Sequence, residues 1–363
     1  MAALYQKVLA MELLIKEDGL SDWLKRWNHA LREQHKLLFD YGKKTIKEEC
    51  AQYTDCPICG QNDTFLQFEK DWFRWVRCKN CSMVYMNPRL TDTVTHQFYN
   101  SDANAIYNES KFDYLSNSST LEDRANIANL HFIDRHRQSA KGTLLEIGSG
   151  KGLFLKKAQE LGYHVYGLEL NNKNCLYSRE VLGSETVLSV DLLEAKFPSK
   201  MFDVIYMRDL IQHIPTPKAF LMECRRIAKP GCTIFIGTHN IEGFVAKAVK
   251  SKYTPIFGFM EPCHFSPRTI TKILKQTGFT VREIQFESLD CTIGEVISHF
   301  VSPRFTTIFP AEIGRAQYFV LRLLLAFLVR TPLRYLDNLV TPKITNWLKQ
   351  GSWMNVLAEK NIP

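Results

Sequence analysis

The sequence predicts an α/β fold built on an open, mostly parallel sheet, and two observations support this prediction. From about residue 120, short β-branched or apolar runs alternate with stretches of helical character. One of these runs, GTLLEIG at 142–148, leads into a loop with glycine at every second position. Such alternation is typical of βαβ units, in which helices cover both faces of a sheet.

The predicted strands lie at 142–148, 164–170, 186–191, 202–207 and 232–238. Between them are GLFLKKAQELG, NNKNCLYSREVLG and TPKAFLMECRRIAKPG, which have the length and apolar spacing of helices. We therefore assign residues 121–290 to one core domain. A core of this size suits a chain of 363 residues with an ordinary apolar content of 45%.

Residues 1–52 are predicted to form an amphipathic helical arm. Apolar side chains recur there at helical spacing, with charged residues between them, at Leu20, Trp23, Leu24, Trp27 and Leu31. The extreme N-terminus carries charges from Lys7 onward and shows no small-residue cleavage site after an apolar stretch. It therefore predicts the start of a helix and not a secretory signal.

Cys56, Cys59, Cys78 and Cys81 form two CxxC pairs with eighteen residues between the pairs. A CxxC turn can place two thiolates on one ion, and four thiolates complete the tetrahedral shell that structural zinc prefers. Residues 53–90 are therefore predicted to be a zinc ribbon with no open metal position for catalysis. Ten cysteines are few for this length, so the pattern indicates a reducing compartment, the cytoplasm.

Two further segments flank the core. Residues 91–120 are polar and are predicted to be a connecting segment, whereas residues 291–363 are predicted to be a helical, basic and apolar tail. Residues 303–351 hold seven Lys or Arg against two Asp or Glu, and their longest uncharged apolar run, 323–329, is too short to cross a bilayer. This composition predicts either peripheral membrane contact through 315–340 or packing on the core or a partner subunit.

The glycine loop lies between a strand and a helix, so its backbone amides can approach a ligand closely. Two common nucleotide motifs do not fit it. A Walker phosphate loop requires Ser or Thr after its Lys, whereas Gly152 follows Lys151. A GxGxxG fingerprint requires Gly where this chain has Leu153. The pattern that remains is E-x-G-x-G-x-G.

This pattern, with acidic residues at the following strand ends, resembles the class I S-adenosylmethionine-dependent methyltransferases over about residues 120–290. The resemblance implies a Rossmann-like, seven-stranded, mostly parallel sheet with S-adenosyl-L-methionine as cofactor. It implies that Glu146 orients the loop, that Glu169 accepts hydrogen bonds from the ribose, and that Asp191 lies near the adenine. The cofactor-binding residues it implies are Glu146, Gly148, Gly150, Gly152, Glu169, Leu170, Asp191, Leu192, Met207 and Arg208.

Three histidines are candidates for the chemistry. Methyl transfer from a sulfonium is an in-line displacement, so the enzyme must align the acceptor and often helps to deprotonate it. Histidine suits this task because its pKa lies near neutrality. His213, His239 and His264 lie after predicted strands or before the next helix, although each could instead have a structural role, such as packing in the QHIP loop. Glu261 and Tyr253 are accessory candidates only.

A zinc ribbon ahead of such a core resembles bacterial enzymes that methylate sugars, glycans or small molecules. The C-methylating members continue into a further α/β domain that this tail does not resemble, so O-methylation of a sugar, glycan or other small hydroxylated acceptor is predicted. Two alternatives stay open. The net charge of +8 and the basic aromatic stretch 71–80 could hold an RNA backbone, although nucleic acid is the less favoured partner. An intact cofactor loop would also suit a non-catalytic adaptor.

Overall fold

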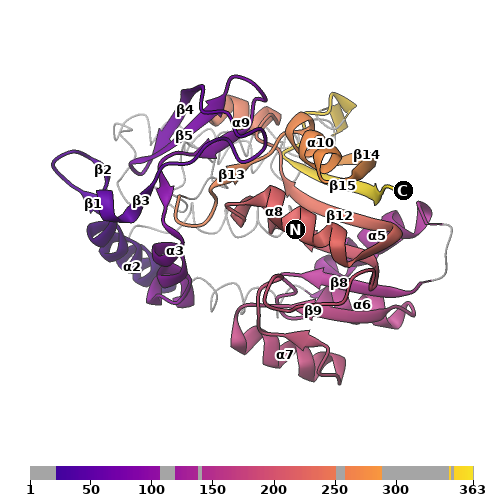
Figure 1. The fold of residues 1–363 in the computed structure, drawn as a ribbon. Coiled ribbons are helices and arrows are strands. Elements are labelled where there is room, and N and C mark those ends of the chain that lie inside the picture. The colour runs from indigo at the N-terminus through magenta and orange to yellow at the C-terminus, as the bar shows by residue number, and fades with distance from the viewer. Residues whose placement is uncertain are drawn as a thin grey trace, which may run out of the picture. The chain divides into compact units, whose positions relative to one another are not determined.

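The computed structural model describes residues 22–106, 119–137, 141–250, 258–287, 343–344 and 347–362. The chain divides into two compact units. The N-terminal unit comprises residues 1–117, 240–264 and 286–353, and the sheet unit comprises residues 118–239, 265–285 and 354–363. Each unit is therefore built from segments that are far apart in the sequence, as the colours of Figure 1 show.

The sheet unit contains a seven-stranded sheet in the order β10-β9-β8-β11-β12-β15-β14. Its strands are β8 (Thr143–Ile147), β9 (His164–Leu168), β10 (Val187–Leu188), β11 (Phe202–Arg208), β12 (Ala228–His239), β14 (Phe279–Glu287) and β15 (Trp353–Lys360). The pairings β10 to β9, β9 to β8, β8 to β11 and β11 to β12 are all parallel. The predicted seven-stranded, mostly parallel sheet is therefore confirmed.

Helices accompany this sheet in the βαβ pattern that the sequence predicts. They are α5 (Ser119–Arg135), α6 (Leu153–Glu160), α7 (Asn172–Leu182), the short 3₁₀ helix η3 (Ile211–His213), α8 (Pro217–Ile227) and α10 (Pro267–Gln276). α6 contacts β9, α5 and α7. Phe154 of α6 stacks on Tyr206 of β11 at 3.6 Å between ring centroids, and Tyr206 stacks in turn on Phe235 of β12 at 4.7 Å. These three rings join α6 to the middle of the sheet.

One strand lies where the sequence predicts a helical tail. Residues Trp353–Lys360 form β15, which lies between β12 and β14 in the sheet. The first six of its eight residues are buried. A strand buried on both faces lacks the polar and apolar alternation that marks a half-exposed strand, so its sequence, WMNVLAEK, carries no period-2 signal. The helical prediction for these residues is therefore wrong.

The N-terminal unit begins with α2 (Asp22–Leu38) and the short strands β1 (Phe39–Asp40) and β2 (Thr45–Ile46), which pair with each other. A 3₁₀ turn, η2 (Glu48–Cys50), leads to β3 (Ala51–Gln52), which pairs with β7 (Arg89–Leu90). A second sheet has the order β13-β6-β5-β4, from β4 (Thr64–Lys70), β5 (Phe73–Cys78), β6 (Val84–Met86) and β13 (Cys263–His264). α3 (Asp92–Tyr99) and α9 (Phe244–Val249) complete its described elements.

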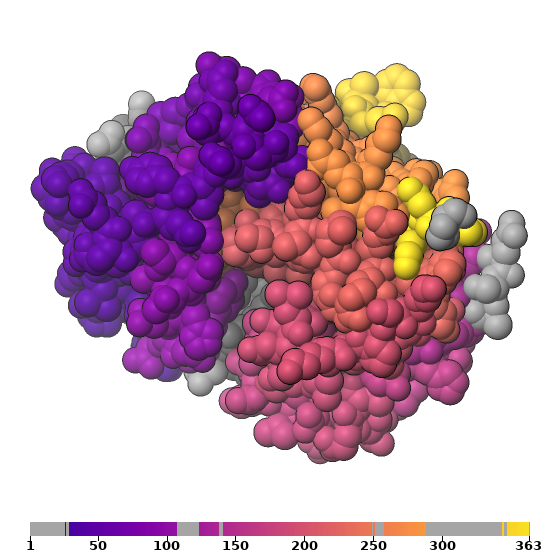
Figure 2. All heavy atoms as spheres, viewed as in Figure 1, coloured from indigo at the N-terminus to yellow at the C-terminus, as the bar shows by residue number. Residues whose placement is uncertain are grey.

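Aromatic side chains hold the segments of this unit together. Phe259 lies 5.1 Å from Phe73 and 5.0 Å from Phe98 between ring centroids. A Cβ added at Gly258 would lie 2.1 Å from the Phe73 ring, so only glycine permits this approach. In the space-filling view the indigo and violet residues of the unit form one closely packed body (Figure 2).

The structure changes three of the segment boundaries that the sequence predicts. The helix of the predicted arm 1–52 ends at Leu38, and short strands follow it. Part of the predicted connecting segment 91–120 is α3, capped by the Thr91 side chain, which accepts a hydrogen bond from Val94 N–H. Residues 240–264, predicted to belong to the core 121–290, belong to the N-terminal unit because β13 pairs with β6.

Some predictions fall outside the described residues. The basic stretch 315–340 is one of them, and Tyr253 is another. Within the described part of the chain, no helix combines the length and the apolar character that are needed to cross a membrane.

Candidate functional site

The candidate site residues of the sheet unit gather at one edge of the sheet. Five parallel strands end at Ile147, Leu168, Leu188, Arg208 and His239. Because parallel strands share a direction, their carboxyl ends meet at the same edge, where open α/β sheets bind their ligands. Every predicted cofactor residue lies among the last two residues of one of these strands or in the loop that follows it.

Backbone geometry explains the three glycines of the loop after β8. Gly148, Gly150 and Gly152 have φ values of +77°, +52° and +71°, a region that favours glycine. The N–H groups of Gly148 and Ser149 both donate to the carbonyl of Leu168 at the end of β9, at 2.8 and 3.0 Å. The loop is therefore tied to the neighbouring strand, and it turns sharply enough to start α6.

Glu169 has a role in the loop that the sequence prediction did not include. Its Oε2 accepts a hydrogen bond from Gly150 N–H and its Oε1 accepts one from Asn171 N–H, both at 2.8 Å. The Ser178 hydroxyl of α7 donates to the carbonyl of Gly150 at 2.7 Å. Glu169 and Ser178 thus fix both sides of Gly150, whereas the contact of Glu169 with a ribose stays a prediction.

The remaining predicted cofactor residues differ in exposure. Leu170 is 65% exposed, whereas Leu192 is buried. Asp191 is exposed, and its Oδ1 accepts a hydrogen bond from Glu194 N–H at 2.7 Å. Met207 is buried within the sheet, so its backbone is the part that could meet a ligand.

A carboxylate that the sequence prediction missed lies beside one of the candidate histidines. Asp209 follows the last residue of β11, and its Oδ1 is 3.9 Å from His239 Nε2 at the end of β12. The Gln212 side chain donates to Asp209 Oδ1 and accepts from the Thr238 hydroxyl at 2.9 Å. Asp209 has φ of +59°, which is uncommon for a residue other than glycine and is frequent at functional sites.

Burial sets the charge state of His239. Its side chain is 18% exposed, and desolvation lowers the pKa of the imidazole to about 4, although the Asp209 carboxylate acts in the opposite direction. His213 contributes a smaller lowering of this pKa, which places the two histidines near each other. At neutral pH the His239 imidazole is therefore uncharged and able to accept a proton.

Comparisons with known proteins agree with this geometry. A family model described as a methyltransferase domain matches residues 121–284. This part of the chain therefore resembles a methyltransferase domain.

Two curated relatives match part of the chain. The ubiquinone biosynthesis O-methyltransferase of Paraburkholderia phytofirmans is 30% identical over 132 residues, which cover 34% of this chain and 56% of that protein. Its namesake in Nitrosospira multiformis is 26% identical over 167 residues, covering 43% of this chain and 70% of that protein. The match thus spans little more than half the length of the first of these relatives.

Solved structures also match. A SAM-dependent methyltransferase from Archaeoglobus fulgidus aligns with a TM-score of 0.43 at 17% sequence identity, covering 69% of this chain and 99% of that one.

The third candidate histidine does not lie in the sheet unit with the other two. His264 belongs to β13 of the N-terminal unit, where it pairs with Val84 of β6. It is 4% exposed, and its ring centroid is 6.1 Å from that of Trp75. Of the three histidines, the structure therefore brings only His213 and His239 together in the sheet unit, on the edge that carries the glycine loop.

The four cysteines of the two CxxC pairs form one cluster in the N-terminal unit. Their sulfur atoms all lie within 4.8 Å of one another, with Cys56 Sγ 3.4 Å from Cys81 Sγ and Cys59 Sγ 3.5 Å from Cys78 Sγ. A tetrahedral zinc ion with bonds of about 2.3 Å would place its sulfur ligands about 3.8 Å apart. The cluster therefore fits a zinc ion after small movements of the side chains.

The two halves of the cysteine cluster have the same backbone geometry. Gly60 N–H donates to the carbonyl of Cys56 at 2.9 Å, and Ser82 N–H donates to the carbonyl of Cys78 at 2.9 Å. Gly60 and Ser82 also share a left-handed conformation, with φ of +70° and +67°. Two matched turns of this kind present two thiolates each, as a structural zinc site requires.

Proposed function

We propose that this protein is an S-adenosylmethionine-dependent O-methyltransferase whose acceptor is a small hydroxylated molecule, with sugars and glycans among the candidates. The observation that carries the proposal is the pair of His239 and Asp209 on the same sheet edge as the glycine loop. The relatives named as O-methyltransferases support transfer to oxygen. The adaptor alternative is less favoured, since an adaptor would need no proton acceptor at this edge.

The residues at the loop fit the cofactor. A Cβ added at Gly150 would find no atom within 4 Å, so the backbone there is open to a ligand. Ser149 is 6% exposed, and its hydroxyl has no hydrogen-bond partner among the described residues. A buried hydroxyl without a partner is costly, so a polar group of a ligand would satisfy it. Glu146, Glu169 and Asp191 would complete the set by the roles that the family resemblance implies.

In this scheme the cofactor supplies an electrophilic methyl group on a sulfonium. His239 Nε2 would take the proton of the acceptor hydroxyl while the acceptor oxygen replaces the sulfur on the methyl carbon. The sulfur would leave as a neutral thioether, and the imidazole would become positively charged. Asp209 Oδ1, 3.9 Å away, stabilises that charge. Gln212 holds the carboxylate in place through its side-chain hydrogen bond, and Thr238 fixes Gln212. General base catalysis of this kind contributes about 10²- to 10⁴-fold in rate.

Transfer of a labelled methyl group tests this proposal. The purified chain is incubated with labelled cofactor and with panels of phenols, methyl glycosides and RNA, and product is counted. We expect a hydroxylated small molecule to be methylated, and His239→Asn to lower the rate about 10²- to 10⁴-fold. The matched control is His164→Gln, because His164 is an exposed histidine at the amino end of β9. Preferential methylation of RNA, or an undiminished rate in His239→Asn, would contradict the proposal.

A further inference from the structure

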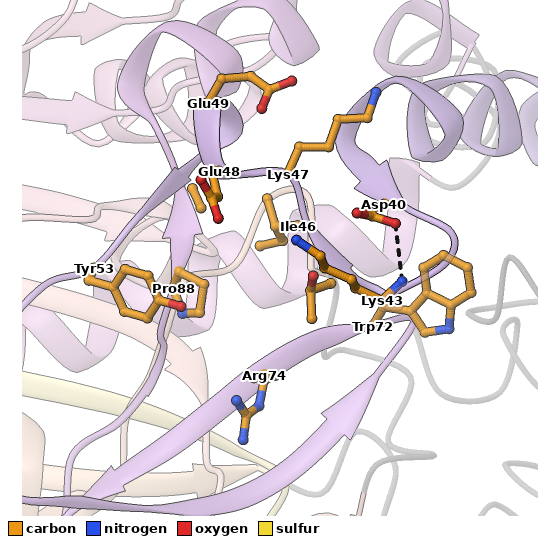
Figure 3. A pocket seen from close by; sticks show the side chains of 12 residues that line it. Asp40, Lys43, Ile46, Lys47, Glu48, Glu49, Tyr53, Trp72, Arg74 and Pro88 are labelled. Carbon is orange, nitrogen blue, oxygen red and sulfur yellow. Dashed lines mark hydrogen bonds between the residues drawn. The ribbon is translucent and has the colours of Figure 1, made fainter.

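A pocket of about 440 Å³ lies in the N-terminal unit, far in sequence from the glycine loop. We call it the hairpin pocket. Its walls come from the β1–β2 hairpin, the stretch around β3, the start of β5 and the loop before β7. Figure 3 shows Tyr53 and Pro88 at one side of the pocket and Trp72 at the other. This volume is within the range of about 300–1,000 Å³ that small-molecule sites occupy.

Trp72 is held rigidly at the pocket wall. Asp71 and Trp72 form the two-residue turn between β4 and β5, with φ of +51° and +65°, where Asn-Gly is the usual sequence. A bulky side chain in this region is an outlier that the surrounding structure must impose. Three rings surround the indole, those of His35, Phe39 and Tyr41, at 4.6, 5.8 and 4.8 Å between ring centroids. The indole is therefore a fixed aromatic surface.

Tyr53 offers a second ring, and it is open to solvent. Its exposed fraction is 78%, which is high for so large an apolar surface. Tyr53 and Pro88 both line the pocket, and Figure 3 shows them on the same side of it. Two aromatic rings on opposite sides of one pocket suit a ligand with apolar C–H faces.

The charged groups of the hairpin pocket balance each other. Three acidic residues and three basic residues line it, so the pocket has no excess of cations for a polyphosphate or a nucleic-acid backbone. Asp40 accepts hydrogen bonds from Gly42 N–H at 2.8 Å and Lys43 N–H at 3.1 Å, which fix its carboxylate. Arg74 is 48% exposed, and its Nε is 3.0 Å from Glu69 Oε1.

We propose that the hairpin pocket binds an uncharged sugar ring. Hydroxyl groups both donate and accept, so they match a wall that holds carboxylates and cationic donors in equal number. The C–H faces of the ring would pack on Trp72 and Tyr53. The residues that line the pocket lie between Asp40 and Pro88, outside the residues 121–284 that the methyltransferase family model matches. Sugar binding in this pocket does not depend on methyl transfer.

Saturation-transfer NMR on the full chain tests the inference, with the methyl glycosides of glucose, mannose, galactose and rhamnose as probes. We expect at least one glycoside to receive saturation at its ring protons. Tyr53→Ala should weaken that binding by about tenfold, in line with the loss of one stacked ring, whereas Tyr53→Phe should retain most of it. Tyr53 is exposed, so neither change should disturb the fold, which circular dichroism verifies.

Two control variants test whether the glycoside binds at the hairpin pocket itself. Phe65→Ala removes another exposed ring, 47% exposed, from β4 outside the hairpin pocket and should leave glycoside binding intact. Gly150→Arg changes the cofactor loop and should also leave glycoside binding intact. The outcome for the hairpin pocket is therefore independent of whether the protein transfers methyl groups. Absence of saturation for every glycoside, equal losses in Tyr53→Ala and Phe65→Ala, or preferential binding of inorganic pyrophosphate would each overturn the inference.

Discussion

At the scale of single residues, the candidate catalytic pair is His239 and Asp209. The sequence can reveal that His239 lies at the end of a strand. The pKa of His239, however, depends on burial and on Asp209, which lies 30 residues earlier in the chain. Desolvation outweighs the attraction of Asp209, and the imidazole is neutral well below pH 7. The imidazole therefore need not lose a proton at physiological pH before it accepts one, and the same desolvation makes it a weaker base than an exposed histidine.

Replacing Asp209 should therefore change a titration as well as a rate. The carboxylate raises the pKa of His239 against the effect of burial, so Asp209→Asn should move that pKa below its value of about 4. Because the charge formed on His239 would also lose its partner, we expect the methylation rate at pH 7 to fall about tenfold or more. Histidine-selective NMR titration measures the first effect, with exposed His164 as the internal control. An unchanged or higher His239 pKa would contradict the pairing.

Gly150 offers a second residue-scale prediction, on cofactor binding. Its positive φ of +52° disfavours any side chain, and an added Cβ would point into open space beside the loop. Gly150→Arg should therefore abolish binding of S-adenosylmethionine in calorimetry, while the protein stays folded by circular dichroism. Gly183→Ala is the matched control, because Gly183 also has a positive φ, +62°, but caps α7 instead of forming the loop. Equal affinity in the two variants would argue against a cofactor site at the loop.

At the scale of elements, the two CxxC turns show how local sequence specifies local geometry. Each turn closes with the same backbone hydrogen bond, and the strands β4 to β6 bring the pairs together. Desolvation raises the pKa of Cys81 to about 11, whereas at Cys59 hydrogen bonds from the Asn80 side chain, the Gln61 backbone and the neighbouring thiols outweigh desolvation and lower the pKa to about 6. A thiolate there is suited to bind a metal ion.

Metal analysis of cysteine variants tests the zinc site. We expect the purified protein to hold about one zinc ion per chain and Cys78→Ala to lose it, since three thiolates leave the tetrahedral shell incomplete. Cys50→Ala is the matched control, because Cys50 is a buried cysteine of the same unit outside the cluster. Removal of zinc by a chelator should lower the thermal stability of the N-terminal unit and leave binding of S-adenosylmethionine intact. Zinc retained at full occupancy in Cys78→Ala would refute the assignment.

At the scale of the whole molecule, the order of segments in space differs from their order in the chain. The chain leaves the sheet unit after residue 239 and returns to it at residue 265. It leaves the unit again after residue 285 and returns at residue 354. Its sheet is completed by β15, whose residues lie more than 60 positions after β14. Strand β15 separates β12 from β14, so the sheet cannot form a continuous hydrogen-bonded order without it.

Truncating side chains of β15 should therefore destabilise the sheet unit. Leu357 is fully buried, and Leu357→Ala should lower the free energy of unfolding by about 2–5 kcal/mol because it leaves a cavity. Ile362→Ala, just beyond the strand at 70% exposure, should change it by no more than about 0.5 kcal/mol. Urea denaturation measures both values. Equal effects of the two substitutions would mean that β15 does not belong to the core of the sheet.

The sequence by itself determined the elements whose signals are local. These are the βαβ alternation, the glycine loop in which three positive φ values require glycine, and the two cysteine turns. The tertiary structure decided what depends on distant partners. Burial on both faces conceals β15, the pairing of β13 with β6 moves His264 into the N-terminal unit, and Asp209 becomes significant only because parallel strands place it beside His239. Spacing along a chain records periodicity and turn chemistry, whereas burial and the approach of two charges exist only once the chain has folded.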